Sequence, residues 1–129
     1  MKRISGWSLP VVTLVGVLSL AAPQAVSAQA ALPDGVTAAM VETGKTLFHG
    51  AALCANCHGQ AGVGSGIAPN LADKTWLHID GAYAAIVKTI TDGVPSPKES
   101  MIPMLPKGGS GITDEQVKAV SAYVYSISR

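Results

Sequence analysis

The sequence predicts an all-α domain that follows a secretory leader. Three segments place apolar side chains at helical spacing, and no segment alternates apolar and polar residues convincingly with the period of two that a strand shows. The chain has 129 residues, two cysteines and a formal net charge of +1. A chain of this length holds at most one small domain once a leader is removed.

The first residues have the composition of a signal peptide. Lys2 and Arg3 make the start positive, residues 11–22 form an uncharged apolar run, and small residues suit cleavage after residue 28 or 30. An uncleaved anchor is the alternative, but prolines and polar residues interrupt the run of about 20 apolar residues that a membrane span needs. We therefore expect a signal peptide over residues 1–28, cleaved as late as residue 30, and a periplasmic domain over residues 31–129.

Removal of the leader leaves a domain with little net charge. Lys2 and Arg3 are lost with it, so 7 basic residues face 8 acidic ones and the net charge becomes −1. Nucleic-acid binding depends on clustered Lys and Arg. The composition therefore argues against nucleic acid as a partner.

Residues 37–52 predict the first helix. Thr37 follows the turn signal of residues 33–35 and suits an N-cap. Apolar or small residues then recur at helical spacing and would share one face: Met40, Gly44, Leu47, Phe48 and Ala51. This helix would deliver the chain directly to Cys54.

The second helix is expected to begin at Asp80 as N-cap and to end at Gly93. Its apolar face would consist of Tyr83, Ile86, Val87 and Ile90.

The last helix has the strongest local signature. Thr113 and Gln116 have the spacing of a capping box, and Asp114 and Lys118 that of a favourable charge pair. The buried stripe would consist of Val117, Val120, Val124 and Ile127.

Four chemistries fit the segment CANCH, residues 54–58, in an exported chain. A disulfide between Cys54 and Cys57 would close a very small loop and stabilise little. A thioredoxin-like dithiol is expected near a βαβ pattern, which the sequence lacks. A zinc site would need further ligands from His49, His58 or His78, whose spacing matches no paired-ligand pattern. The fourth chemistry is covalent attachment of haem, for which Cys-x-x-Cys-His is a specific signature.

Haem attachment would give both cysteines and the histidine of this motif a role. Each thiol would add to one vinyl group of the porphyrin, and His58 would be held under the iron as an axial ligand in its neutral form. Only five large aromatic residues remain after the leader. A flat apolar macrocycle would therefore also supply the centre against which the helices pack.

The sixth coordination position of the iron would decide the function. A thioether closes that position and favours electron transfer at a raised potential, whereas an open position favours ligand binding or peroxide chemistry. Met101 and Met104 lie on a segment that Pro103 and Pro106 stiffen. An isolated methionine is most often core filler, but this loop makes either sulfur a candidate ligand.

In these motifs the chain resembles the class I c-type cytochromes, small exported proteins with one haem. The matching segments follow the family order from about Met40 to Ile127, and they read GKTLFHGAALCANCHG, IAPNL, MLPKGGSGIT and DEQVKAVSAYV. The resemblance implies an all-α, cytochrome c-like bundle of three main helices wrapped around one covalently attached haem c.

The resemblance also implies a role for individual residues. Cys54 and Cys57 would carry the two thioether bonds, and His58 would be the fifth ligand of the iron. The carbonyl of Pro69 would accept a hydrogen bond from that histidine and fix its tautomer. Gly44 would let the first helix pass close to the last one.

The sixth-ligand loop departs from the family pattern, in which proline directly follows the methionine. Met104 and Met101 are each separated from the next proline by one residue. We expect Met104 to be the ligand, because its distance to Ile112 fits the family loop without a gap, and we hold Met101 in reserve. Of the residues outside these motifs, Trp76 can donate to a haem propionate or simply pack, whereas His49 and His78 are expected at the surface or behind the ligands.

Together these features predict a periplasmic electron carrier and not an enzyme. Its partners would be redox proteins, with a dehydrogenase as donor and an oxidase or another cytochrome as acceptor. The chain would serve as a mobile shuttle or as the cytochrome subunit of an exported dehydrogenase or respiratory chain, and it would meet the membrane only if the leader is retained. The alternative is a haem enzyme or sensor whose open sixth position takes peroxide or a gas.

Overall fold

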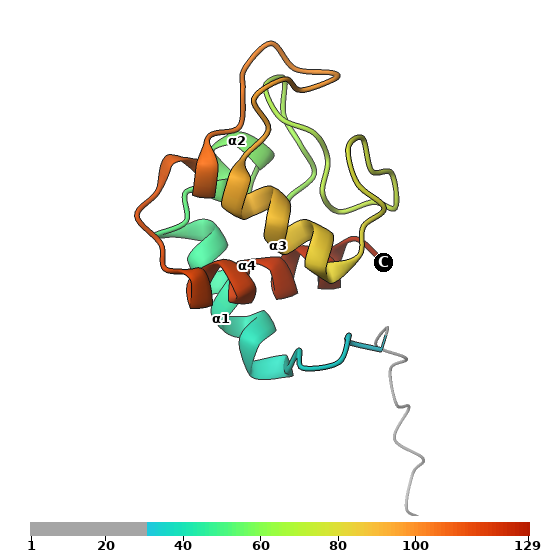
Figure 1. The fold of residues 1–129 in the computed structure, drawn as a ribbon, viewed down its shortest axis with the longest axis vertical. Coiled ribbons are helices and arrows are strands. Elements are labelled where there is room, and N and C mark those ends of the chain that lie inside the picture. Colours follow the sequence, from blue (N-terminus) through green and yellow to red (C-terminus); the bar gives the residue numbers. More distant parts are fainter. Residues whose placement is uncertain (1–30) are drawn as a thin grey trace, which may run out of the picture.

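The computed structural model describes residues 31–129, which form four α-helices and one short 3-10 helix (Figure 1). In chain order they are α1 (Ala38–His49), α2 (Cys54–His58), α3 (Tyr83–Asp92), η1 (Pro106–Gly109) and α4 (Asp114–Ile127). Within residues 31–129 no strand forms, and a single antiparallel bridge joins Val94 to Met104. The predicted all-α fold class is confirmed. The expected signal peptide lies outside the described residues.

Helix α1 begins as its sequence predicts but ends earlier. The backbone N–H of Met40 donates to the hydroxyl of Thr37 at 3.2 Å, so Thr37 is the N-cap. Gly44 and Phe48 are buried on the predicted face. Ala51 is exposed and lies beyond the end of the helix, where the chain turns toward α2; its place on the buried face was predicted wrongly, and Ala52 is buried instead.

Helix α3 starts two residues beyond its expected cap. Ala82 is the N-cap residue, and Asp80 instead accepts the N–H of Ala82 at 2.9 Å, forming a turn ahead of the helix. Gly93 ends the helix with φ of 76°, a conformation that a side chain disfavours. Ile86 and Ile90 form the buried face, as predicted.

Helix α4 has the complete capping box that its sequence predicts. The N–H of Gln116 donates to the Thr113 hydroxyl at 3.2 Å, and the N–H of Thr113 donates to the Gln116 side chain at 2.9 Å. Asp114 and Lys118 form no direct ion pair, although the charge of Lys118 helps to lower the pKa of Asp114, after the larger effect of Lys107. Asp114 instead pairs with Lys107 of η1 at 2.8 Å, while Lys118 pairs with Glu115 one helical turn earlier.

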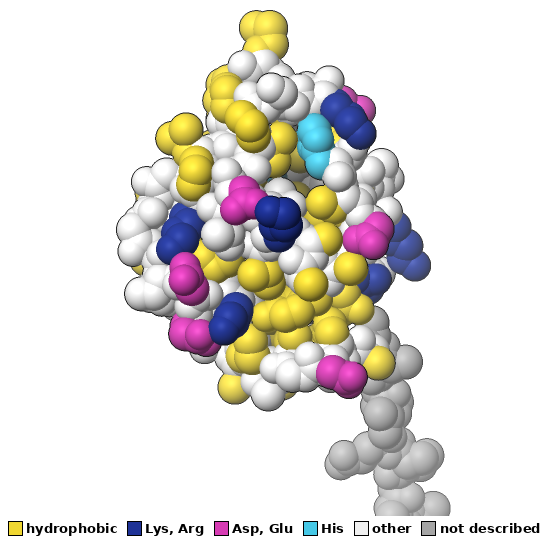
Figure 2. Space-filling model, in the orientation of Figure 1, with side chains coloured by type: hydrophobic (Ala, Val, Ile, Leu, Met, Phe, Trp, Pro, Cys, Tyr) yellow, Lys and Arg dark blue, Asp and Glu magenta, His cyan; other side chains and the backbone are white. Residues whose placement is uncertain are grey.

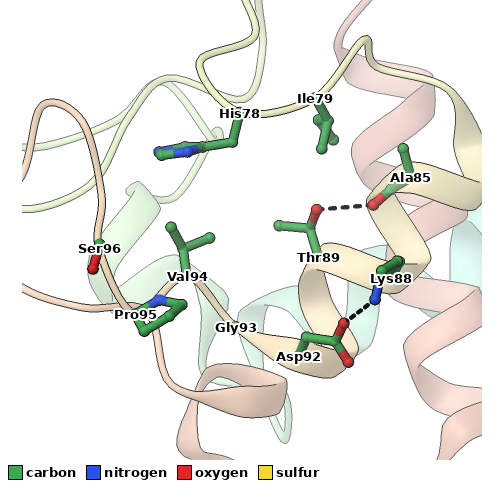
Figure 3. Close-up of a pocket in the computed structure, with 10 residues that line it drawn as sticks. All are labelled: His78, Ile79, Ala85, Lys88, Thr89, Asp92, Gly93, Val94, Pro95 and Ser96. Carbon is green, nitrogen blue, oxygen red and sulfur yellow. Dashed lines mark hydrogen bonds and ion pairs between the residues drawn. The ribbon is translucent and has the colours of Figure 1, made fainter.

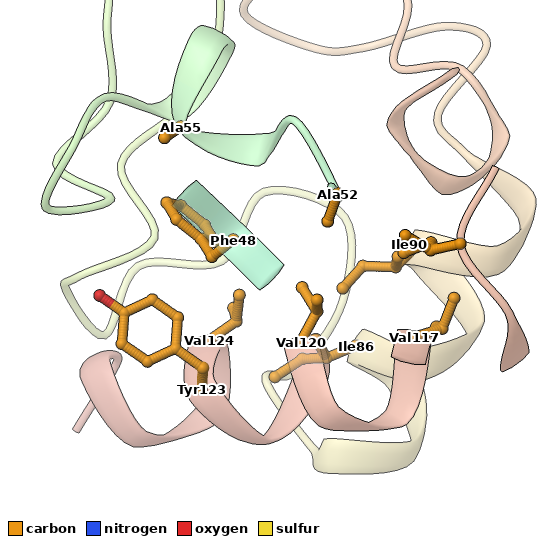
Figure 4. Close-up of a cluster of buried hydrophobic side chains, with 10 residues drawn as sticks. Phe48, Ala52, Ala55, Ile86, Ile90, Val117, Val120, Tyr123 and Val124 are labelled. Atoms are coloured by element: carbon orange, nitrogen blue, oxygen red, sulfur yellow. The ribbon is translucent and has the colours of Figure 1, made fainter. Parts of the chain in front are cut away.

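The core forms where α4 crosses α1, with α3 packed on the other side of α4 (Figures 1 and 4). Gly44 makes this crossing possible, because a Cβ at this position would lie 1.9 Å from the backbone oxygen of Ala119. Next to it, the rings of Phe48 and Tyr123 meet edge to face with centroids 5.3 Å apart. Val120 and the other buried side chains of α4 pack into the core below the segment CANCH, residues 54–58 (Figure 4).

Candidate functional site

A cavity of about 430 Å³ lies between α2, α3 and the loops that follow them. Its walls are largely apolar, which is typical of cofactor sites. The structure brings all four sequence-predicted site residues into this one cavity: Cys54, Cys57, His58 and Met104.

The first three of these residues come from α2, a five-residue helix that sequence periodicity missed. The chain enters it through Leu53 in the left-handed conformation, with φ of 60°, and leaves it through Gly59 with φ of 78°. Residues three apart lie on one face of a helix, so Cys54 and Cys57 both face the cavity. A helix of this length contains too few residues for a periodic pattern. The motif CANCH was the available signal.

The imidazole of His58 is oriented by one hydrogen bond. Its Nδ1 lies 2.9 Å from the carbonyl oxygen of Pro69. A carbonyl oxygen only accepts, so Nδ1 carries the hydrogen and Nε2 of the neutral ring carries the lone pair. Burial lowers the pKa of His58, and the Pro69 carbonyl opposes that effect in part. The ring is therefore held neutral with one nitrogen able to ligate a metal.

The two cysteines are not bonded to each other, and they lack the properties of a reactive thiol pair. Burial raises the pKa of the Cys54 thiol to about 11, and the neighbouring Cys57 adds to the rise. At neutral pH such a thiol is protonated, whereas redox dithiols depend on a thiolate.

Among residues 31–129, His, Cys, Asp and Glu side chains form no group of three or more that could hold a metal ion. Neither a thioredoxin-like dithiol nor a structural zinc site is supported.

The structure separates the two candidate methionines. Met104 is partly buried, packs against the core and lines the cavity. Its backbone is fixed on both sides, because its N–H donates to the Val94 carbonyl at 3.0 Å and its carbonyl accepts the Val94 N–H at 2.8 Å. Met101 is 98% exposed.

The remaining residues singled out from the sequence lie around the site. Trp76 lines the cavity and packs closely on Gly81, where a Cβ would lie 2.1 Å from the indole nitrogen. His49 lies outside the cavity lining, with Nδ1 2.7 Å from the Lys45 carbonyl and Nε2 2.6 Å from the Gln60 carbonyl. His78 lines both this cavity and a second hollow of about 370 Å³ beside α3.

The second hollow does not have the features of the first. It is bordered by His78, Thr89 and the loop after α3, and Lys88 pairs with Asp92 at its edge (Figure 3). None of the cysteines or methionines of the described part of the chain reaches it. The chemistry predicted from the sequence therefore belongs to the larger cavity alone.

The larger cavity fits haem c. Apolar walls suit the porphyrin ring, two thiols occupy one short helix, and a neutral imidazole and a thioether are the donor pair that electron-transfer haems use. Within residues 31–129 no buried side-chain nitrogen or oxygen lacks a hydrogen-bond partner. No buried polar group in this part of the chain therefore requires a different, polar ligand.

Comparison with known proteins agrees with this site. The family model for cytochrome c matches residues 41–128. The chain is 44% identical over 85 residues to the cbb3-type cytochrome c oxidase subunit CcoP of Rubrivivax gelatinosus, an alignment that covers 66% of this chain and 25% of that protein. It is 38% identical over 91 residues to the corresponding subunit FixP of Sinorhizobium medicae, covering 68% of this chain and 28% of that protein. The chain thus spans about a quarter of the length of these relatives.

A solved structure shows the same fold. Cytochrome CL from Methylophaga aminisulfidivorans superposes with a TM-score of 0.55 at 22% sequence identity, covering 72% of this chain and 56% of that one. The family match, extending over most of the described residues, implies the same cofactor that the cavity fits. The chain belongs to the cytochrome c family and is a class I c-type cytochrome with covalently attached haem c.

Proposed function

We propose that this cytochrome is a periplasmic one-electron carrier in which Cys54 and Cys57 hold the haem and His58 and Met104 ligate its iron. The observation that carries the proposal is the convergence of these four side chains on one cavity, with Met101 turned out to solvent. A cytochrome c domain supports electron transfer in general. The two axial ligands give that role its chemical detail.

Hydrogen bonds to the backbone of other residues position the two proposed axial ligands. The Pro69 carbonyl fixes the tautomer of His58, and such outer contacts raise the basicity of a ligating imidazole. The paired hydrogen bonds to Val94 hold the backbone of Met104. Haem bound here supplies one-electron chemistry at an iron whose potential a methionine ligand raises. Because both ligands stay in place, little of the chain has to rearrange when an electron is gained or lost.

The mouth of the cavity has the character of a transient docking surface. Four exposed apolar side chains border it, namely Leu53, Ile67, Ile102 and Leu105. Glu99 is the one Asp, Glu, Lys or Arg residue among the residues that line the cavity. Apolar side chains also gather at the end of the molecule where the loop between α3 and η1 lies (Figures 1 and 2). A redox partner with an apolar, weakly charged face would fit this mouth.

The relatives support a role for this chain in respiration. CcoP and FixP are subunits of cbb3-type cytochrome c oxidases. For this chain we propose a place in a respiratory chain, as a shuttle or as the cytochrome subunit of an exported complex, with a dehydrogenase as donor and an oxidase or another cytochrome as acceptor. The expected leader supports export. Among residues 31–129 no helix has the length and apolar character to cross a membrane.

Electron self-exchange tests both the carrier role and the docking surface. In an NMR experiment on mixed ferrous and ferric protein, we expect fast exchange whose rate changes less than about twofold between low and high salt, because few charges meet at the mouth. The Ile102→Glu variant places like charges opposite each other when two copies meet. Its exchange should be about fivefold slower at low salt and should recover at high salt.

The matched control is Ala39→Glu, which adds the same charge to an exposed position of α1, outside the cavity lining. It should leave the exchange rate within about twofold of the unmodified protein at both salt concentrations. Slow exchange in the unmodified protein would contradict the carrier role. If both variants slowed the exchange equally, the carrier role would stand but the proposal that two copies meet at the mouth of the cavity would be contradicted.

A further inference from the structure

The loop that carries Met104 closes over the cavity and is tied to its surroundings at few points. It runs from Gly93 to η1, and the bridge between Val94 and Met104 joins its two ends. Its apex contains Met101, which is 98% exposed and packs on little. The position of the loop over the cavity therefore depends on the few hydrogen bonds that its middle part makes.

Ser100 makes the bond that crosses the mouth of the cavity. Its hydroxyl donates to the carbonyl of Ile67 at 2.8 Å and accepts the backbone N–H of Ile102 at 3.0 Å. The carbonyl of Ile102 lies further away, at 3.2 Å, and a hydroxyl has one hydrogen to donate. Ser100 thus joins the methionine loop to the segment on the opposite wall of the cavity.

A second serine continues this connection to the haem-binding turn. The hydroxyl of Ser65 donates to the Cys57 carbonyl at 2.5 Å and accepts the N–H of Ile67 at 3.2 Å. Ile67 thereby donates to Ser65 and accepts from Ser100. The two hydroxyls and the peptide groups between them form a continuous path from the CANCH turn to the methionine loop.

The other hydrogen bonds of the loop lead elsewhere. The backbone N–H of Lys98 donates to Nε2 of His78 at 3.2 Å, and its ammonium group donates to the Leu77 carbonyl. These contacts reach the segment ahead of α3. Among the hydrogen bonds within residues 31–129, the one from Ser100 alone connects residues 95–103 to the walls formed by residues 53–72.

We infer that Ser100 is a positioning residue that keeps the methionine loop closed and so lowers the fraction of molecules in which Met104 has left the iron. This inference rests on the proposed ligation by Met104. Loss of the Ser100 hydroxyl frees the Ile67 carbonyl at an exposed site, where water can replace it. The bond from the Ile102 N–H lies within the loop and does not tie it to the opposite wall. The expected effect on closure is therefore that of one net hydrogen bond, about a fivefold rise in the open fraction of the loop.

The test is imidazole binding to the ferric, haem-loaded protein, followed by the loss of the methionine-to-iron charge-transfer band. Imidazole reaches the iron only where Met104 has left, so its apparent affinity reports the open fraction. We expect Ser100→Ala to bind imidazole about fivefold more tightly than the unmodified protein and Ser100→Thr to restore the original affinity. Amide hydrogen exchange at Met104, whose N–H donates to the Val94 carbonyl and not to Ser100, should speed up in the alanine variant as well.

Ser96→Ala is the matched control. Ser96 lies on the same loop, beside the second hollow (Figure 3), and its hydroxyl makes no hydrogen bond within residues 31–129. This variant should bind imidazole as the unmodified protein does. If Ser100→Ala also does so while the charge-transfer band is present, the inference about Ser100 is wrong and the proposed ligation stands. If the unmodified protein lacks the band, both are wrong.

Discussion

Replacing Met104 with alanine is expected to raise the rate of carbon monoxide binding to the reduced protein about 100-fold. With Met104 bound to the iron as proposed, carbon monoxide binds only when the loop opens, and a minor state of this kind holds on the order of 1% of molecules. The alanine side chain removes the competing thioether. The reduction potential should fall as well, because methionine ligation raises it. Stopped-flow mixing and a redox titration measure the two effects.

Met101→Ala is the control that separates the two sulfurs. Met101 is almost fully exposed, so its loss should leave both the carbon monoxide rate and the ferric charge-transfer band unchanged. If the band disappeared in this variant and survived in Met104→Ala, the sixth ligand would be Met101. Immediate binding of carbon monoxide by the unmodified protein would instead favour a haem enzyme or sensor with an open position.

Replacing Gly44 with alanine is expected to destabilise the haem-loaded protein by about 3 kcal/mol or more. The new Cβ would lie 1.9 Å from the oxygen and 2.6 Å from the carbon of the Ala119 carbonyl, and both atoms belong to the backbone of α4. Backbone atoms cannot rotate away as a side chain does, so α1 and α4 would have to separate. A domain of this size has a total stability of about 5–15 kcal/mol. Urea unfolding of the loaded protein measures the change.

Gly111→Ala is the matched control for this loss. A Cβ at Gly111 meets nothing within 4 Å, and its φ does not lie in the left-handed range. Its free energy of unfolding should stay within about 0.5 kcal/mol of the unmodified protein. Equal stability of Gly44→Ala and Gly111→Ala would show that the close crossing of α1 and α4 is not required.

The sequence predicts the long helices well because their signals are local. Thr37 and Thr113 cap the first and last helices as expected, and Gly93 ends α3. Each of these depends on contacts within about four residues along the chain. The cap of α3 was misplaced because Asp80 forms its own turn two residues earlier, which sequence alone does not distinguish from a cap.

Features that depend on distant segments were harder to predict. The partner of Asp114 is Lys107, which η1 brings close through a turn whose residues Lys107 and Gly108 have positive φ. The proposal of Met104 over Met101 also rests on tertiary packing, since Met104 packs against the core and lines the cavity whereas Met101 is exposed. The serine path through Ser65 and Ser100 has no sequence signature at all, because isolated serines are common in loops.

Intact-mass measurement of the exported protein, with peptide mapping of the modified segment, shows whether haem is covalently attached to Cys54 and Cys57. We expect a chain that lacks its leader and carries the added mass of one haem on the peptide containing Cys54 and Cys57. Substituting both cysteines with alanine should abolish that addition. An exported chain with the mass of the polypeptide alone, or with haem that dissociates on denaturation, would contradict the account.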